Sequence, residues 1–521
     1  MVWPVAVWFV VCCGSARLAA AGDRGAAVRK HDGPYNVLFL MTDELHYRAL
    51  SAMGNRCIST PNIDRLGRDG AWFQNATCVT PYCSPSRASI ITALYPHTHG
   101  ILSNVGDGKR GQMPLSPNQF PNTETILHRQ GYATEHRGKW HLSGTRDFAA
   151  GNTGDFACYE PWNYLGKTDE EYKKFLDERL PAGQFAGHPA PGNYLGRPVQ
   201  MIPAMEKAYR AIQSDRQGYW AYIAIVGRSA IPPALLPETR ITDEALRLLE
   251  KHARERFMIT VSWSPPHDLW VIPEPYYSMV DRRKLELRGH RDPSDWCTAG
   301  FSQRLGDLAG EEGLREFVAV YYGMVKYIDD QVGRILGKLD ELGLAQNTLV
   351  IFTSDHGDML GAHGCIGKCT DGYSDDLVRI PLLMRLPGAI KAGTVVRQPV
   401  SQVDLMPTIL DYVGQPAPAH IHGQSARPLV EGRGVPWRDY AFCQRANESR
   451  MLRTEQYKYV LVRGGKRAAL YDLRRDPDEN YDLAGKPEQA DVARQMYRRL
   501  LEVMAKDGDP LRGKFLDRPL P

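Results

Sequence analysis

This sequence lacks the features of a membrane protein and of a nucleic-acid-binding protein. Beyond residue 21, no apolar run is long enough to cross a bilayer, so no membrane span is predicted. Lys and Arg are not clustered into the runs that contact nucleic acid, although the formal net charge is +4. Cys365 and Cys369 have no second Cys or His pair at zinc-ligand spacing, which argues against a structural zinc. The mild positive charge suits an anionic substrate.

The long apolar stretch of this chain lies at its N-terminus. It covers residues 3–13 and is followed by small residues that end in Ala19-Ala20-Ala21. A stretch of this length before an Ala-x-Ala site predicts a secretory signal peptide over residues 1–21, since a membrane span needs about 20 apolar residues. We therefore expect an exported protein, which would be periplasmic or extracellular in a bacterium and secretory or lysosomal in a eukaryote.

The length of the chain predicts more than one folding unit. Single hydrophobic cores stop growing near ~250–300 residues, and this chain has 521. A connector rich in Pro, Gly and His covers residues 416–436. We predict a large α/β domain over residues 22–430 and a smaller C-terminal subdomain over residues 431–521.

Three apolar runs predict strands that are buried on both faces, as in parallel sheets. They cover residues 35–42, 257–263 and 347–354. Polar residues follow each run: Asp43 and Glu44, His267, Asp355 and His356. Ligands of open α/β sheets gather at the carboxyl ends of the strands. These side chains are therefore candidates for one site at one sheet edge.

Apolar residues at helical spacing alternate with these strands. The spacing predicts helices over residues 243–252 and 314–342. We expect a large mixed, mainly parallel sheet flanked by helices on both faces. In the C-terminal subdomain, two strand-like runs at residues 457–462 and 469–473 and a helix near residues 489–504 predict an α+β unit with a short antiparallel sheet.

One long stretch shows little periodicity. Residues 147–237 are rich in Gly, Pro and Tyr. We predict that they form loops over the sheet edge, where contacts that select a substrate tend to lie.

The run Cys83-Ser84-Pro85-Ser86-Arg87 carries the strongest chemical signal. Taken alone, Cys83 could be an ordinary buried or disulfide cysteine. The run resembles the signature of the formylglycine-dependent sulfatases of the alkaline phosphatase superfamily. The resemblance implies that a formylglycine-generating maturation enzyme oxidises Cys83 to Cα-formylglycine. The hydrated aldehyde offers two oxygens, one to attack sulfur and one to expel the product by re-forming the carbonyl.

The same resemblance implies a metal site. Its ligands would be Asp43, Glu44, the hydrate oxygen of residue 83, Asp355 and His356. Glu44 stands where the family usually has Asp, so its carboxylate is one methylene longer. Oxygen ligands indicate Ca²⁺, and direct ligation by His356 would leave Mn²⁺ as an alternative.

Further residues match the family in chain order and would act on the sulfate group. The resemblance implies that Lys139 and Lys368 bind sulfate and that His141 takes a proton when sulfate is eliminated. His267 would contact the sulfate or the leaving oxygen, and Arg87 would hold the hydrate beside the metal. Cations are needed there because negative charge must be stabilised in the transition state.

The resemblance spans residues 35–486 and implies hydrolysis of a sulfate monoester, with a sulfated small molecule or oligosaccharide as substrate. Sulfated saccharides are the preferred class. One alternative is a formylglycine-dependent phosphonate monoester or phosphodiester hydrolase, because the superfamily uses the same aldehyde on phosphorus. A second is a binding protein in which Cys83 is never oxidised.

Overall fold

The computed structural model describes residues 34–105, 119–142, 169–180, 192–194, 197–215, 224–288, 300–369, 372–445, 449–462 and 467–516. The predicted signal peptide at residues 1–21 lies outside these ranges. Among the described helices, none combines the length and the apolar character needed to cross a membrane.

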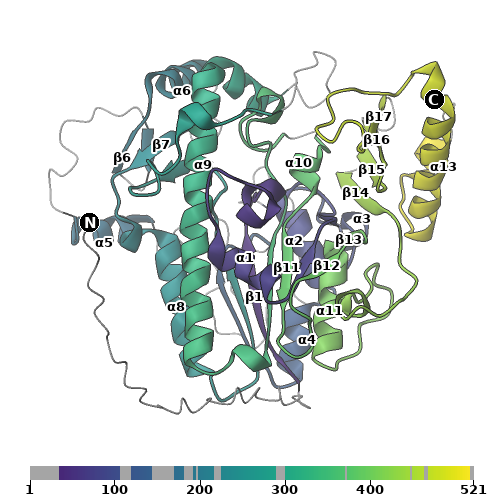
Figure 1. Cartoon of the computed structure of the whole chain (residues 1–521), viewed down its shortest axis with the longest axis horizontal. Coiled ribbons are helices and arrows are strands. Elements are labelled where there is room, and N and C mark those ends of the chain that lie inside the picture. Colours follow the sequence, from purple (N-terminus) through teal and green to yellow (C-terminus); the bar gives the residue numbers. More distant parts are fainter. Residues whose placement is uncertain are drawn as a thin grey trace, which may run out of the picture. The chain divides into compact units, whose positions relative to one another are not determined.

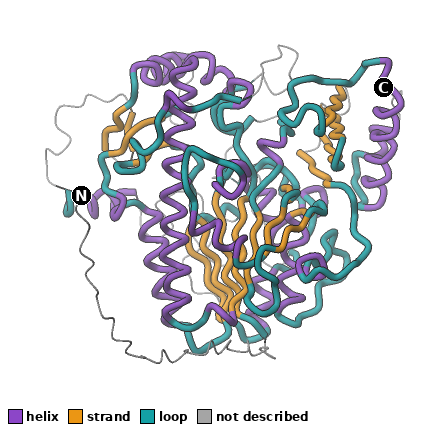
Figure 2. Tube along the Cα trace, in the orientation of Figure 1, coloured by secondary structure: helices purple, strands orange, loops and turns teal. Residues whose placement is uncertain are grey.

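A seven-stranded sheet forms the centre of the fold (Figures 1 and 2). Its strands, in spatial order, are β12 (Thr394–Val396), β2 (Ala71–Phe73), β11 (Leu382–Arg385), β10 (Thr348–Ser354), β1 (Asn36–Thr42), β8 (Phe257–Ser262) and β4 (Ala133–Gly138). β1 is parallel to β10 and β8, β4 is parallel to β8, and β12 is parallel to β2. β11 is antiparallel to both of its neighbours. The predicted mixed, mainly parallel sheet is confirmed.

The register of the central strands brings their carboxyl ends together. Thr42 lies opposite Ser354, and Ser262 lies opposite both Met41 and Gly138. The chain therefore leaves neighbouring strands at one edge of the sheet. All residues of β1, β8 and β10 are buried, which explains the continuous apolar runs in the sequence.

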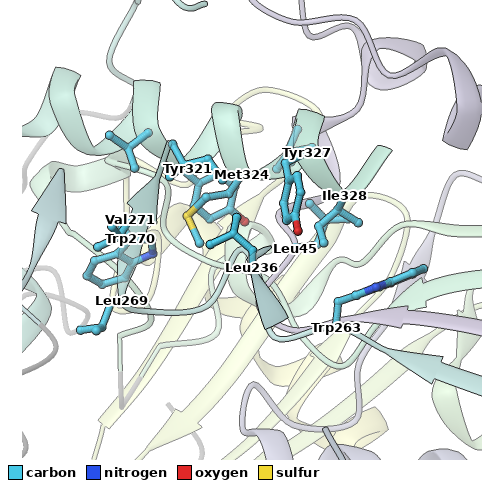
Figure 3. Packing of buried hydrophobic residues seen from close by; sticks show 14 of the residues in the cluster. Leu45, Leu236, Trp263, Leu269, Trp270, Val271, Tyr321, Met324, Tyr327 and Ile328 are labelled. Atoms are coloured by element: carbon cyan, nitrogen blue, oxygen red, sulfur yellow. The ribbon is translucent and has the colours of Figure 1, made fainter. Parts of the chain in front are cut away.

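Helices cover both faces of this sheet, as predicted. On one face, Leu38 and Leu40 belong to a core with α1 (Pro61–Arg68), α8 (Pro237–Lys251) and α9 (Phe301–Glu341). Figure 3 shows part of this core, including Trp263, Trp270, Tyr321 and Met324. On the other face, Val37, Phe39 and Met41 belong to a second core with α2 (Cys83–Thr92), α4 (Thr123–Arg129) and α11 (Leu405–Tyr412). Alternate side chains of β1 thus enter different cores.

The prediction of loops over residues 147–237 is wrong where the structure describes them. The described parts contain α5 (Asp169–Asp177), β5 (Gly192–Tyr194), β6 (Arg197–Gln200), α6 (Pro203–Asp215) and β7 (Val226–Ser229). β5, β6 and β7 form a second sheet with β9 (Trp270–Ile272). The strands are three or four residues long, too short to show periodicity. α6 did carry a signal, because its buried residues have helical spacing: Met205, Ala208, Tyr209 and Ile212.

The C-terminal part is a smaller α+β unit, as predicted. It contains the antiparallel sheet β14 (Ala441–Arg445), β15 (Ser449–Arg453), β16 (Tyr457–Val462) and β17 (Arg467–Asp472), followed by α13 (Ala490–Lys506) and α14 (Arg512–Leu516). Residues of α13 such as Met496 and Leu500 pack with Tyr459 and Leu470 of the sheet. A domain boundary after residue 430 stays a prediction.

Short elements complete the described fold. They are β3 (Ala76–Thr77), α3 (Pro96–His99), α10 (Asp375–Val378), β13 (Val400–Ser401) and α12 (Arg427–Val430), with short 3-10 turns between them.

Candidate active site

Cys83 lies at the first turn of α2 and is fully buried at the carboxyl edge of the central sheet. Its Sγ is 3.6 Å from Asp43 Oδ1 and 3.3 Å from His356 Nε2. The amino groups of Lys368 and Lys139 lie 3.7 and 4.0 Å from the same sulfur. The cysteine of the motif therefore meets residues from three strand ends and a loop.

Arg87 binds two carboxylates of the predicted metal site that follow different strands. It lies four residues after Cys83 on α2, so both side chains lie on one helix face. Its guanidinium donates to Asp43 Oδ2 at 2.9 Å and to Asp355 Oδ2 at 2.8 Å. It also donates to the Lys139 carbonyl at 2.8 Å and to Ser262 Oγ at 2.9 Å. The planar donor fork suits this arrangement of several fixed acceptors.

Cations and carboxylates alternate around the sulfur. Lys139 Nζ lies 2.6 Å from Asp43 Oδ2, and Lys368 Nζ bonds to Glu44 Oε1. His267 Nε2 is 3.4 Å from Glu44 Oε1 and 3.3 Å from Lys368 Nζ. This pattern places sulfate-binding candidates beside metal-ligand candidates.

The surrounding charges lower the pKa of Cys83 and of Asp43. Burial raises the pKa of Cys83, but Lys139, Lys368 and His356 outweigh burial and hold that pKa well below its usual value. Burial and Cys83 oppose ionisation of Asp43, yet Lys139, His267 and Arg87 keep the Asp43 pKa well below its usual range. The site therefore stabilises negative charge at residue 83.

Two histidines are shifted in opposite directions. Burial lowers the pKa of His141 to about 4, and the charge of Lys139 adds to this effect. Burial also lowers the pKa of His267, but Asp268 and Glu44 outweigh it and raise the pKa to about 9. His141 is therefore neutral and can accept a proton near pH 7, while His267 is charged and can donate one.

The residues at the sheet edge fit a hard divalent cation. Asp43, Cys83, Asp355 and His356 each offer a ligand atom, and these atoms lie within 4.8 Å of one another. Glu44 belongs to a second such group, and no described residue offers its buried Oε2 a hydrogen bond apart from the Asp358 carboxyl. A buried carboxylate oxygen of this kind is costly unless it is paired or bound to a metal. The donor set is mainly oxygen, which hard cations prefer.

The structure brings all the predicted site residues together, and their individual roles stay predictions. It also adds residues that the sequence reasoning missed. Gln402 Nε2 donates to the carbonyls of Ser354 and Asp355 at 3.1 and 2.7 Å, and Ser86 Oγ donates to the latter at 2.6 Å. Asp268 Oδ1 lies 3.0 Å from His267 Nδ1. Ser86 lies inside the cysteine motif and Asp268 follows His267, whereas Gln402 had no local signal.

Comparison with known proteins identifies the family. The sulfatase family matches residues 35–415, and the C-terminal family of N-sulphoglucosamine sulphohydrolase matches residues 361–506. An N-acetylglucosamine-6-O-sulfatase of Bacteroides thetaiotaomicron is 28% identical, over 91% of this chain and 87% of its own. An uncharacterized sulfatase of Escherichia coli is 30% identical, over 92% and 88%.

Solved structures share the fold. A phosphonate monoester hydrolase of Silicibacter pomeroyi has a TM-score of 0.72 and 24% identity, over 92% of this chain and 96% of its own. A protein solved with its substrate D-glucosamine-2-N,6-O-disulfate has a TM-score of 0.66 and 22% identity, over 92% and 99%. The chain belongs to the sulfatase family, which implies a formylglycine and a divalent metal, and it is a sulfuric ester hydrolase.

Proposed function

We propose that the protein removes sulfate from a sulfated saccharide, with Cα-formylglycine formed from Cys83 as its nucleophile. The observation that carries this proposal is the buried setting of Cys83, whose sulfur lies within 4.0 Å of two lysines and one aspartate. Two relatives are named as an N-acetylglucosamine-6-O-sulfatase and an ulvan-active sulfatase. These names support a saccharide as the substrate.

The chemistry divides between the nucleophile and the residues around it. The formylglycine hydrate would supply the attacking oxygen and the second oxygen that later expels sulfate. Lys139 and Lys368 bind the non-bridging sulfate oxygens and offset their growing charge. Protonated His267 donates a proton to the leaving alcohol oxygen. Neutral His141 then accepts the proton that must leave the remaining hydroxyl of residue 83 when sulfate is expelled.

Arg87 and the acidic residues organise the other side of the site. Asp43, Glu44, Asp355 and His356 would hold the divalent metal, which offsets charge on the nucleophile and the sulfate group. We propose Ca²⁺ because carboxylate oxygens dominate this ligand set, with Mn²⁺ as the alternative if His356 ligates directly. Arg87 fixes two of the carboxylates from the protein side.

Export and maturation are part of the same proposal. An N-terminal signal peptide would direct the chain to the periplasm or outside a bacterium, or into the secretory or lysosomal route of a eukaryote. A formylglycine-generating enzyme would have to act on Cys83 before folding buries it. Sequencing the N-terminus of the exported protein tests cleavage after residue 21.

The reaction is tested by parallel assays on defined esters. The protein from its native host is incubated with a panel of sulfated saccharides, an aryl sulfate and an aryl phosphonate ester. We expect release of inorganic sulfate from at least one saccharide, with a larger kcat/KM than for the phosphonate. The opposite preference would favour the phosphonate monoester or phosphodiester hydrolase, which fits the sulfatase relatives less well.

A further inference from the structure

A buried polar cluster lies behind Arg87, in the core and outside the set of site residues. It consists of Glu124 on α4, His136 on β4 and Thr260 on β8, with exposed fractions of 3%, 3% and 4%. Its surroundings are largely apolar and include a cavity of about 30 Å³, also lined by Met41 and Met258. Burying a carboxyl and an imidazole in such a place is costly, so their hydrogen bonds are informative.

The contacts of His136 determine which of its nitrogens carries a hydrogen. Nε2 lies 3.3 Å from the Lys139 carbonyl oxygen, and this oxygen can only accept. Nε2 must therefore be protonated for the contact to be favourable. Nδ1 lies 3.3 Å from Glu124 Oε1, which also accepts from Thr260 Oγ1 at 3.2 Å. A bare Nδ1 and a carboxylate oxygen would both be acceptors, so this contact needs a hydrogen on Nδ1 or on the Glu124 carboxyl. In either form, Glu124 holds the ring in the orientation that directs Nε2–H to Lys139.

The carbonyl that His136 contacts belongs to the active site. It also accepts from Arg87 Nη1 at 2.8 Å. Two donors, one from the core and one from the site, therefore converge on one oxygen. The backbone around it is tightly constrained. A Cβ at Gly138 would lie only 1.9 Å from the Ser262 carbonyl oxygen, and His141 has a positive φ of 59°.

We propose that Glu124 and His136 are positioning residues for sulfate hydrolysis. By holding the Lys139 carbonyl, they fix the turn that presents the Lys139 amino group and His141, and they fix one of the acceptors that Arg87 contacts. This inference rests on the proposed function, because it assigns Lys139 to the sulfate group. Removing the outer partners of metal ligands typically costs 10–100-fold in metal affinity or activity, and we expect an effect at the lower end of that range for these partners of Lys139.

Inorganic sulfate binding tests this role without turnover. In a Cys83→Ala background, calorimetry measures the Kd for sulfate. We expect His136→Phe, which keeps a ring of similar size but no donor, to weaken binding about tenfold. His136→Gln restores an N–H donor and should recover part of the loss. His128→Phe is the matched control, because His128 lies half-buried on α4 and bonds to none of these groups through its side chain.

Variants of Glu124 distinguish positioning of the His136 ring from an effect of the Glu124 charge on sulfate binding. They also test the inference if His136→Phe fails to fold. Glu124→Gln can donate its amide hydrogen to Nδ1 and leave Nε2–H directed at Lys139, so sulfate binding should stay near that of the parent. Glu124→Leu releases the ring and should weaken binding. Equal losses in the two variants, or parental affinity in His136→Phe, would overturn the inference.

A second readout does not depend on the function. The ¹⁵N spectrum of the histidine rings, assigned by difference against His136→Phe, should show a hydrogen on Nε2 of His136. A ring protonated on Nδ1 alone would refute the positioning role, whatever the sulfate affinity. If the ring carries Nε2–H but the Cys83→Ala parent binds no sulfate, the assignment of Lys139 to sulfate fails, and both the proposed function and this inference fall with it.

Discussion

Two buried charge clusters in this protein differ in how completely they are paired. One joins the C-terminal sheet to the start of α10: Arg453 on β15, Lys458 on β16 and Glu479 after β17 meet Asp375, the first residue of α10. Arg453 donates to Asp375 at 2.9 and 2.8 Å, and Lys458 Nζ lies 2.6 Å from both acids. Lys458 also donates to the Tyr373 carbonyl at 2.8 Å. Arg379 Nη1 lies 3.7 Å from Asp375 Oδ2, so three cations face the two acids of this cluster.

The active site is built differently. Two lysines that contact its acids also lie within 4.0 Å of the sulfur of Cys83, and no described residue apart from Asp358 offers a hydrogen bond to the buried Oε2 of Glu44. Two of its histidines have pKa values of about 4 and about 9. In the C-terminal cluster, Arg453 and Lys458 outweigh burial and hold the pKa of Asp375 well below its usual range, whereas burial and the charge of Asp375 raise the pKa of Glu479. Removing one partner from a paired buried cluster is strongly destabilising, whereas an incompletely paired cluster retains groups for a metal and a substrate.

The largest expected effect is a loss of stability when the cluster between the C-terminal sheet and α10 loses a cation. Lys458→Met would leave Asp375 and Glu479 buried with one cation fewer. Removing one partner of a buried ion pair costs about 3–5 kcal/mol. Urea unfolding should show this loss in the free energy of unfolding, while kcat/KM per folded molecule changes little. Lys391→Met, at an exposed lysine, is the control. Unchanged stability in the Lys458 variant would remove the distinction between the clusters.

Lys139→Met should lose more activity than stability. Losing one fixed donor to transition-state charge costs about 2.7–4 kcal/mol, or 10²–10³-fold in rate. Steady-state kinetics should show this loss in kcat/KM, and the free energy of unfolding should fall less than in Lys458→Met, because the buried Asp43 keeps its contact with Arg87. A destabilised variant with intact turnover would show that the charge of Lys139 serves stability and not the reaction.

Metal removal should affect only the incompletely paired cluster. A chelator should abolish turnover and lower the Tm, because a ligand at about 100 times its Kd stabilises by about 2.7 kcal/mol. Added Ca²⁺ should restore both, and Glu44→Gln should require more Ca²⁺. Calorimetric melting with graded Ca²⁺ measures this. A Tm that is insensitive to chelation and to Ca²⁺ would contradict the assignment of the acids as ligands.

The smallest expected effects are the acidic and alkaline limbs of the pH profile of kcat/KM. Turnover needs neutral His141, so activity should fall as the pH drops through about 4. It also needs protonated His267, so activity should fall as the pH rises through about 9. Each limb should approach a tenfold change per pH unit in kcat/KM. In His267→Gln the alkaline limb should vanish from a lowered profile; if that limb persists, another group is the proton donor.

Much of the fold could be predicted because its central strands are apolar along their whole length. β1, β8 and β10 are buried on both faces, so their ends and the acids that follow were visible in the sequence. β2 and β12, with three residues each, are too short to show a period. Their positions depend on partners far away in the chain.

The site could be predicted where a motif links residue type to chemistry. Cys83, Arg87 and Lys139 were found in this way. Gln402 and Glu124 were not, because each acts on a backbone or side-chain group contributed by another element. Such contacts leave no local pattern, and only the fold reveals them.

The central claim is that residue 83 is an aldehyde in the active protein. Mass spectrometry of the peptide that contains this residue, from enzyme purified out of its native host, tests the claim most directly. We expect a peptide that has lost the sulfur of Cys83 and reacts with a hydrazide, in a fraction that rises with specific activity. A fully active enzyme whose Cys83 is an unmodified, alkylatable thiol would contradict this account.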